Sequence, residues 1–397
     1  MHAALAFLQV AVVAATNSKR LVLLLGTVMV CVSAMAQILP QDRVDSMYHS
    51  YDGGDIQVHG PSILVRKSVA DNVSVAANYY VDSISSASVD VKMLSASRYA
   101  EERTQQSASV DYLHDNSMLS YSFISSVEND YQAKTSNFSI SQDMFGGLTT
   151  VVLGYQYGNN DVMKKTDSAF HETAESRGYR VSLSQVLTKD LLLGGAYEVI
   201  TDSGFLNNPY RQIRYVSTAS NATNGYNFTN EIYPQSRTSN AIGLSLRYFL
   251  PYRASISGGY RFYIDSWDIA ANTFDVGYVY PFGANWLFEA SFRLYSQTRA
   301  SFYSDLFDNL QTFRARDKEL STFSDQSIGV GATYKLGRDQ LFLFEKGSIN
   351  LSVNYFTFNY DDFRDVPYGQ ANLLQGGTEP LYQFNATVIR FYVSGWF

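Results

Sequence analysis

The sequence contains one cysteine, few charges and, over most of its length, no long apolar run. Because Cys31 has no second cysteine to join, an internal disulfide is excluded. Charged residues make up 17% of the chain, against about 25% in ordinary soluble domains. Beyond residue 36 no stretch of about 18 apolar residues occurs, so a transmembrane helix is excluded there. Tyrosine (30) and phenylalanine (25) are plentiful instead, and both favour β-strands.

The first 36 residues have the pattern of a targeting sequence. The basic pair Lys19-Arg20 precedes the apolar residues 21–32, and Ala34-Met35-Ala36 then provides the small residues of a cleavage site. We predict a secretory signal peptide at residues 1–36, which leaves Gln37 as the mature N-terminus. A single membrane anchor is the alternative, although the apolar core is short for one.

From residue 55 onward, apolar and polar residues alternate in segments of about ten residues. In Trp286–Ser296, for example, Trp286 and Phe292 share one face while Glu289 and Arg293 share the other. A tilted strand needs about ten residues to cross a bilayer, and a chain without helical spans crosses only as a closed barrel. We therefore predict an all-β fold, a transmembrane antiparallel up-and-down β-barrel of about sixteen strands, with fourteen to eighteen as the range. The predicted strands lie near residues 55–59, 62–69, 73–83, 106–114, 118–127, 133–142, 148–157, 177–187, 191–201, 238–249, 254–265, 270–280, 286–296, 326–335, 348–360 and 385–397.

The connections between these strands alternate in length. The long ones fall at residues 84–106, 158–176, 202–237, 297–325 and 361–380. Outer-membrane barrels have short periplasmic turns and long extracellular loops. This assigns residues 37–54 to a periplasmic N-terminal segment and residues 55–397 to the barrel. A soluble sandwich shares the alternation, and the signal peptide, the aromatic excess and the C-terminus argue against it.

Charged residues within the strands have the parity opposite to the apolar row. A charge on the lipid face near the middle of a bilayer destabilises a barrel by about 2–4 kcal/mol, so we predict that these side chains line the lumen. They are Asp82, Asp111, Arg180, Glu198, Arg247, Arg261, Asp265, Asp275, Glu289, Arg293, Lys335 and Arg390.

The C-terminus ends in an alternating aromatic strand. Phe391, Val393, Trp396 and the terminal Phe397 resemble the signal that the barrel-assembly machinery of the outer membrane reads on its substrates. An ordinary edge strand that happens to end in phenylalanine is the alternative.

Several long segments resemble a family of bacterial outer-membrane proteins filed as a domain of unknown function, number three-five-seven-zero. The matching segments are Gly60–Lys67, Tyr79–Ser88, Gly178–Leu187, Leu206–Arg211, Phe302–Phe307, Arg316–Ser321 and Tyr360–Asp365. The resemblance covers nearly the whole mature chain. It implies an outer-membrane location and a barrel, and it implies no reaction.

Few residues point to chemistry. A Ser-His-acid hydrolase needs a base beside its nucleophile, and nothing in the sequence places His114 or His171 in such a site. Asp361, Asp362 and Asp365 could bind a hard cation such as calcium, but Arg364 lies among them. The sequence therefore favours an Arg/Asp network that holds the loops, and it predicts neither a catalytic residue, a metal site nor a cofactor.

The charged run from Arg314 to Glu319 falls in a long connection and has two interpretations. It is either a constriction loop folded into the lumen or a solvated external loop, and the sequence favours neither.

The leading hypothesis is a porin-like channel for small solutes in the outer membrane of a Gram-negative bacterium. Its expected partners are outer-membrane lipid and the barrel-assembly machinery, and a net charge of −7 without a basic stripe argues against nucleic acid. The first alternative is a structural or scaffold barrel whose plugged lumen serves a periplasmic partner. The second alternative is an outer-membrane enzyme, and we expect that the protein is not an enzyme.

Overall fold

The fold is seen in a computed structural model, which describes residues 38–86, 93, 99–218, 224–337 and 343–397. The predicted signal peptide, its cleavage site and Cys31 lie outside these residues. Within the described part of the chain, no helix has the length and apolarity needed to cross a membrane.

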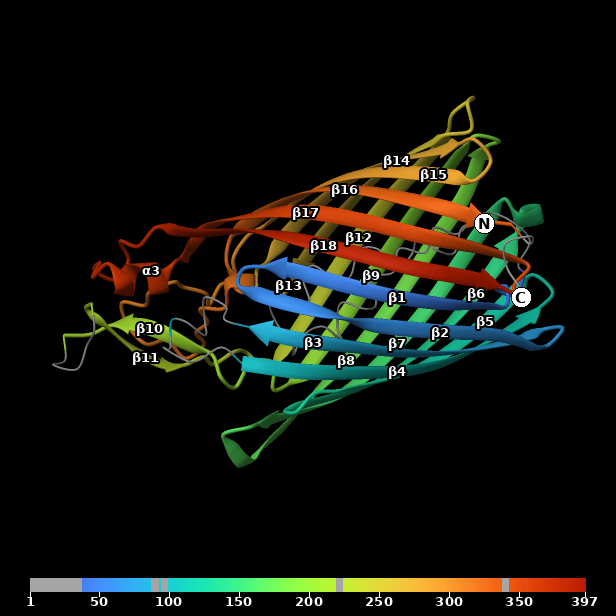
Figure 1. The fold of residues 1–397 in the computed structure, drawn as a ribbon. Helices are drawn as coiled ribbons and strands as arrows, with labels where there is room; N and C mark the ends of the chain where they lie inside the picture. The colour runs from blue at the N-terminus through green and yellow to red at the C-terminus, as the bar shows by residue number, and fades with distance from the viewer. Residues whose placement is uncertain (1–37, 87–92, 94–98, 219–223, 338–342) are drawn as a thin grey trace.

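Sixteen strands of the described chain close into one antiparallel barrel (Figure 1), which confirms the predicted fold class. Strand β1 closes the barrel by pairing with β18, and a separate β10–β11 hairpin is inserted between neighbours β9 and β12. The strands are β1 (Arg43–Gly53), β2 (Ile56–Ala70), β3 (Val73–Ser86), β4 (Tyr99–His114), β5 (Ser117–Val127), β6 (Tyr131–Met144), β7 (Thr149–Lys164), β8 (Asp167–Thr188), β9 (Leu191–Gly204), β10 (Gln212–Val216), β11 (Tyr226–Asn230), β12 (Ser236–Phe249), β13 (Ser255–Asp265), β14 (Ala270–Phe282), β15 (Trp286–Gln297), β16 (Phe323–Leu336), β17 (Lys346–Arg364) and β18 (Leu381–Trp396). Short helices are η2 (Phe145–Gly147), η3 (Lys318–Leu320) and α3 (Val366–Ala371).

The barrel begins earlier than predicted. Residues 43–53, assigned above to a periplasmic segment, form β1 and pair with both β18 and β2. The outward row of β1 mixes Val44 and Tyr48 with Ser46, Ser50 and Asp52, so the strand lacks the continuous apolar row on which the sequence prediction relied. A two-residue turn at Gly54-Asp55, both with positive φ, then leads into β2, as is typical of tight hairpins.

The predicted strands 55–59 and 62–69 are a single strand, β2. Gly60-Pro61 suggested a break because this dipeptide usually marks a turn. In the structure the Gly60 backbone lies so close to β3 that an added Cβ would be 1.8 Å from the carbonyl oxygen of Val81. The β2–β3 pairing is interrupted between His59 and Ser62. The sixteen-strand count thus holds because one missed strand offsets one split strand.

The two ends of the barrel differ. Short turns after β2, β4, β6, β8, β12 and β14 lie at the end that also holds the C-terminus, and we name this the turn end. Long connections gather at the other end, where α3 and the β10–β11 hairpin lie (Figure 1). The predicted long connection at residues 158–176 is mostly strand, because β7 and β8 continue as a hairpin beyond the barrel wall.

Strand β17 reverses its polarity along its length. In its first half, toward the turn end, Leu351 and Tyr355 point outward and are about half exposed, while serines and asparagines point inward. In its second half Phe356, Phe358 and Tyr360 are the inward residues and are buried, while polar side chains point outward. The alternation itself continues, and only the side that carries the apolar row changes.

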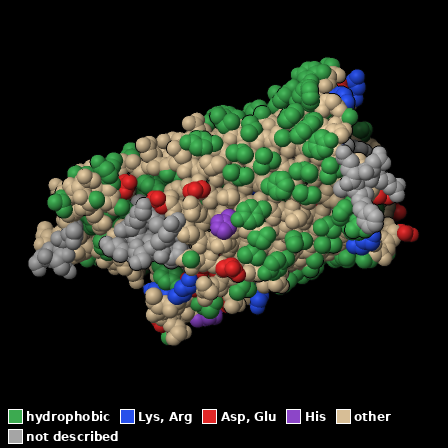
Figure 2. All heavy atoms as spheres, viewed as in Figure 1, with side chains coloured by type: hydrophobic (Ala, Val, Ile, Leu, Met, Phe, Trp, Pro, Cys, Tyr) green, Lys and Arg blue, Asp and Glu red, His purple; other side chains and the backbone are tan. Residues whose placement is uncertain are grey.

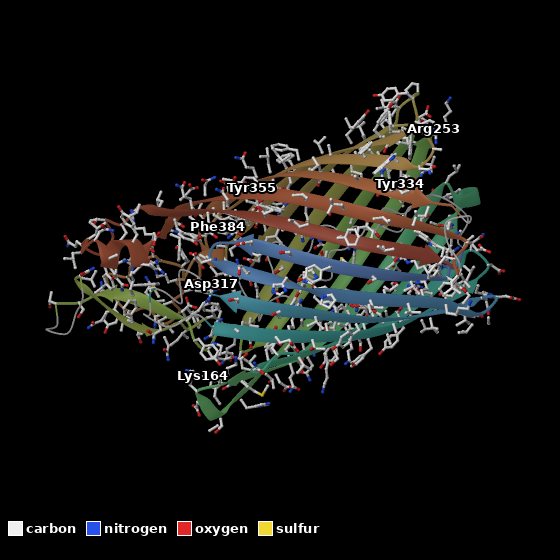
Figure 3. The ribbon with its side chains drawn as sticks, viewed as in Figure 1. Lys164, Arg253, Asp317, Tyr334, Tyr355 and Phe384 are labelled. Carbon is white, nitrogen blue, oxygen red and sulfur yellow. The ribbon has the colours of Figure 1, made fainter. Side chains whose placement is uncertain are left out.

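Strand β18 reverses in the same way. Phe391 and Val393 point outward near the turn end, whereas Tyr382, Phe384 and Val388 point inward near the other end. The outward apolar rows together form a zone around the wall that we name the belt. In Figure 2 many of its hydrophobic side chains lie on the wall to the right of the view, and Figure 3 places Tyr355 and Phe384 on either side of the reversal.

Candidate functional site

Three chain segments close the end of the barrel opposite the turns. They are residues 205–218 and 224–235, which we count as one segment, residues 298–322, and residues 365–380, and together we name them the cap. Backbone hydrogen bonds join the first two: Ile232 and Arg314 exchange both of theirs, at 3.0 and 2.8 Å, and Phe307 bonds to Arg214 and Val216 at 3.0 and 2.8 Å. The cap is therefore a structured unit, made of segments far apart in the sequence.

The cap packs against the inward apolar rows of the wall. Phe302, Tyr303 and Leu320 from the second segment form one buried cluster with inward residues of β1, β2, β3, β17 and β18. Tyr360, Phe363, Tyr382 and Phe384 stack on one another within it. Burying a large apolar side chain stabilises a fold by about 1.5–3 kcal/mol. Because several such side chains are buried here, this cluster stabilises the cap in the mouth of the barrel. The polarity reversal of β17 and β18 supplies the surface on which the cap rests.

A buried arginine joins all three cap segments. Arg214 of β10 is fully buried and contacts Asp305 of the second segment and Glu379 of the third. Its Nε also donates to the carbonyl oxygen of Asp305 at 2.9 Å. Breaking a buried ion pair leaves an uncompensated charge, which destabilises by about 3–5 kcal/mol. Arg214 therefore locks the segments to each other.

A second arginine extends this network. Arg316 Nη2 lies 2.9 Å from Asp305 Oδ1 and donates to the carbonyl oxygen of Arg364 at 2.9 Å. Its guanidinium also lies over the ring of Phe363, 4.3 Å from the centroid. Arg316, Asp317 and Lys318 are all buried. Of the two interpretations of the 314–319 run, the structure therefore supports a loop folded into the mouth.

A third cluster contains two carboxylates. Asp317 pairs with Arg211, while Glu231 accepts hydrogen bonds from Tyr233 Oη and from the main-chain N–H of Arg316, both at 2.7 Å. Burial and, next, the neighbouring Asp317 carboxylate raise the pKa of Glu231 to about 7. In Figure 3 Asp317 lies at the mouth of the barrel, near the β10–β11 hairpin.

The tip of the second segment is the helix η3. Asp317 accepts the N–H of Glu319 at 3.0 Å and so caps this helix. The ammonium of Lys318 lies 5.3 Å from the ring centroid of Phe384 and 6.0 Å from that of Tyr382, distances at which cation–π attraction acts. A lysine thus reaches into the aromatic cluster beneath the cap.

Toward the turn end the interior is polar and built from small residues. Inward positions of β9 and β12–β17 are rich in glycine and serine. An added Cβ on Gly259 would lie 2.5 Å from Asp275 Oδ1, and one on Gly329 would lie 2.2 Å from Asn354 Oδ1. Polar side chains of neighbouring strands therefore lie flat across these glycines. In small barrels, by contrast, large inward side chains fill the interior.

The structure places the predicted lumen residues on the inward rows of their strands. Arg180, for example, lies between the outward Tyr179 and Val181, which are about half exposed. The twelve residues are Asp82, Asp111, Arg180, Glu198, Arg247, Arg261, Asp265, Asp275, Glu289, Arg293, Lys335 and Arg390, and none of them is on an exposed row.

Several of these charges meet an opposite charge. Arg180 and Glu198 are cross-strand partners, and Arg261 Nη2 lies 3.6 Å from Glu198 Oε2. Arg293 is the cross-strand partner of Asp275 and lies 3.3 Å from Asp325. The inner wall thus carries paired charges of both signs and no field of a single sign.

Three of the twelve are part of closed clusters. Asp82 is buried against Arg103 and lies 2.7 Å from His49 Nε2, while Asp111 contacts Arg66. The side chain of Asp265 has no exposed area and pairs with Arg237 at 2.5 Å. These three residues therefore lie on inward rows, and each is held by neighbouring side chains.

Asp265 serves the capped end. Its Oδ1 accepts the N–H groups of Trp267 and Ile269, at 2.9 and 3.0 Å, and so fixes the β13–β14 turn. The indole of Trp267 then packs edge-on against Tyr233 and Phe302 of the cap. Asp265, which was predicted to line the lumen, therefore positions a side chain on which the cap packs.

The histidines that were weighed for catalysis lie far from one another. His114 is exposed at a turn beside Asp115, and His171 is exposed in the β7–β8 hairpin, 3.4 Å from Asp161. The acidic group at the end of β17 belongs to the loop network instead: Asp362 accepts the N–H of Thr322 at 2.8 Å. Asp365 accepts the N–H of Tyr368 and caps α3.

Three other buried acids lie together at the start of β4 and the β5–β6 turn. Carboxylate oxygens of Glu101, Glu128 and Asp130 are within 4.8 Å of one another. The Lys165 ammonium lies 3.4 Å from Glu101, and the Tyr210 hydroxyl donates to Asp130 at 2.5 Å. The cluster thus holds the β7–β8 hairpin and the first cap segment to the wall.

The C-terminal residues lie at the turn end. Phe391 and Val393 are outward and exposed, and Trp396 is half-buried under the ammonium of Lys346. Phe397 contacts Phe344 and the ammonium of Lys67. This placement is compatible with an assembly signal, which remains a prediction.

The cap anchors Arg214, Glu231 and Glu379 were missed by the sequence analysis. They are isolated charges in long connections, and Arg214 and Glu379 are 165 positions apart. One signal was present, however. The apolar row of residues 348–360 changes parity at Tyr355 and Phe356, which indicates a wall segment covered from inside.

No curated protein matches the chain. Among solved structures it is similar to a bacterial polysaccharide outer membrane secretin, with 9% identity over 90% of this chain and 100% of that chain and a TM-score of 0.48. It is similar to the CymD monoaromatic hydrocarbon channel, with 9% identity over 91% and 90% and a TM-score of 0.42. It is also similar to OmpT, an outer membrane protein of Vibrio cholerae, with 9% identity over 91% and 100% and a TM-score of 0.42.

A family model described as a protein of unknown function, DUF3570, matches residues 91–388. This range covers most of the chain and includes the barrel from β4 into β18 together with all three cap segments. The resemblance seen in Gly178–Leu187 and Arg316–Ser321 is thereby confirmed, and the chain belongs to the DUF3570 family.

Proposed function

We propose that the protein is a channel for small polar solutes in the outer membrane of a bacterium, and that the cap is its gate. The capped end is then extracellular and the turn end periplasmic, in line with the general loop pattern of such barrels. In the described structure the gate is closed, because the cap fills the mouth.

The contrast within the barrel carries this proposal. Near the turn end the interior has small polar residues and paired charges, which suit a water-filled passage. Near the cap it is aromatic and filled. A barrel of sixteen strands is wide enough for an aqueous space, so the cap is the main obstacle to a solute.

Conductance in planar bilayers tests the proposal. We expect brief, rare openings for the natural protein and longer, larger conductance steps for Arg214→Met, which breaks the lock between the three cap segments. Arg177→Met is the matched control, because Arg177 is an exposed arginine outside the cap. A heat-modifiable shift on unboiled gels shows that each variant is folded. Silence of all folded variants would contradict a channel.

A permanently plugged scaffold barrel is the second candidate. The fully buried Arg214 and the aromatic cluster favour this candidate, because opening the cap would separate a buried ion pair and expose buried apolar side chains. A stoichiometric periplasmic protein that copurifies with the barrel would support this candidate. The suggested periplasmic arm at residues 37–54 cannot be its binding site as a whole, because residues 43–53 belong to the wall.

The remaining expectations follow the channel proposal. We propose that outer-membrane lipid surrounds the belt and that Phe391, Val393, Trp396 and Phe397 are read by the barrel-assembly machinery. We further propose that the protein catalyses no reaction. Loss of lipid or ester hydrolysis on replacing His114 or His171 would overturn that last proposal.

A further inference from the structure

Two buried carboxylates meet where two cap segments touch. Glu231 follows β11 in the first segment, and Asp317 begins η3 in the second; they are 3% and 1% exposed. The hydroxyl of Tyr233 donates to Glu231 Oε2 at 2.7 Å and lies 3.4 Å from Asp317 Oδ2. One hydroxyl group therefore contacts both acids.

Charged and titratable groups face this pair from several segments. Arg211, which precedes β10, pairs with Asp317, and the main-chain N–H of Arg316 donates to Glu231 Oε1 at 2.7 Å. Lys318 and Glu319 follow Asp317 directly and have opposite charges. The guanidinium of Arg211 therefore contacts one carboxylate of the pair, and its charge also lowers the pKa of the other, Glu231.

We propose that Glu231 and Asp317 share one proton while the cap is closed, and that release of this proton to the medium loosens the contact between the two cap segments. Two ionised carboxylates held together in a buried site repel each other, so one of them stays protonated until the site opens. This inference rests on the proposed function, because it makes the gate sensitive to pH.

The direction of the effect follows from proton linkage. Burial, and next the Asp317 carboxylate, raise the pKa of Glu231 from 4.5 to about 7 in the closed cap. In an open cap, where water reaches Glu231, the pKa returns toward its ordinary value. The closed state then binds more protons than the open state. Proton binding therefore favours closing fully below about pH 4.5, and this contribution is lost as the pH rises to about 7. The closing equilibrium shifts toward open by up to about two orders of magnitude.

Trp267 can report this change directly. Its ring packs edge-on against Tyr233, with centroids 5.7 Å apart, and it is buried. The other two tryptophans, Trp286 and Trp396, lie at the turn end. In the W286F/W396F background we expect the emission of Trp267 to shift to longer wavelength, and its quenching by acrylamide to increase, as the pH rises from about 4.5 to about 7.

Glu231→Gln is the decisive variant. The amide keeps the shape and the oxygen acceptor but does not titrate, so the emission of Trp267 should stay that of the closed cap from about pH 5 to 8. Asp317→Asn should also abolish the transition and serves if the first variant does not fold. Glu175→Gln is the matched control, because Glu175 is an exposed acid on the outer wall, and it should leave the transition unchanged.

The possible failures can be told apart. We call the proton shared by Glu231 and Asp317 the proton latch. A pH-independent Trp267 signal in the natural protein, or an unchanged midpoint in Glu231→Gln, overturns it. If Arg214→Met conducts in bilayers while Trp267 is insensitive to pH, the channel stands and the latch is wrong. If Trp267 responds to pH but no variant conducts, the latch stands and the channel is wrong.

Discussion

The two halves of strands β17 and β18 are built in opposite senses. Toward the turn end, apolar residues such as Leu351 and Phe391 point outward and polar residues point inward. Toward the cap, Phe358 and Phe384 point inward and polar residues point outward. Both halves belong to the same continuous ladder of strand pairing, so the backbone does not cause the difference.

The difference shows what surrounds each half. An outward apolar row with a polar interior suits lipid outside and water inside. The opposite arrangement suits water outside and a packed core inside, as in soluble proteins. The change of phase near Tyr355 therefore marks both the edge of the belt and the floor of the cap.

The largest effect is expected from breaking the lock of the capped half. Arg214→Met leaves Glu379 as a buried charge without its guanidinium, whereas Asp305 keeps its contact with Arg316, and we expect the free energy of unfolding of the cap to fall by about 3–5 kcal/mol. Urea titration followed by Trp267 fluorescence measures the loss. If Arg177→Met, the exposed control, gave an equal loss, the capped half would not depend on buried charge.

Removing an inward aromatic side chain should rank second. Phe358→Ala takes a buried ring out of the cluster, and we expect a destabilisation of about 3–4 kcal/mol. Ser352→Ala changes an inward residue of the same strand in the polar half and should change stability by less than about 1 kcal/mol. Equal effects at both positions, by the same urea titration, would contradict the difference between a packed interior toward the cap and a polar interior toward the turn end.

The third-largest effect is expected from a charge placed on the outward row. Leu351→Arg puts a cation in the belt, and we expect the folded barrel in lipid vesicles to lose about 2–3 kcal/mol. Asn359→Arg lies on the same outward row beyond the reversal and should have almost no effect. The folded fraction, read from heat-modifiable gels across a urea series, decides this. Similar losses at both positions would mean that the belt extends past Asn359.

The smallest effect is expected at an exposed pair. Arg177 Nη2 lies 2.8 Å from Glu175 Oε2, and both side chains are more than a third exposed. Arg177→Ala should destabilise by less than about 1 kcal/mol. A larger loss in the urea series would mean that the outer wall contributes to holding the β7–β8 hairpin in place.

The barrel could be predicted because period-2 alternation and charge parity are local properties of the chain. The same locality explains the two errors near the N-terminus. Strand β1 has polar residues on its outward row, and Gly60-Pro61 looks like a turn although β2 runs through it. These cases depend on how β3 and β18 approach, which no local pattern contains.

The cap was less accessible to sequence reasoning. The 314–319 run has the same composition whether it folds inward or lies in solvent, and the outcome depends on partners such as Asp305 and Arg364. The inward orientation of Asp82 and Asp111 follows from parity, whereas their pairing with Arg103 and Arg66 requires the register of neighbouring strands.

The glycines of the inner wall have a consequence for how such a protein could change. At Gly259 and Gly329 the ends of the Asp275 and Asn354 side chains already occupy the volume that a Cβ would need, so a larger residue at either position has to displace an inward polar side chain. The cap segments carry no such constraint on the bore. Substitutions in the cap could therefore change what covers the mouth while the barrel beneath stays the same.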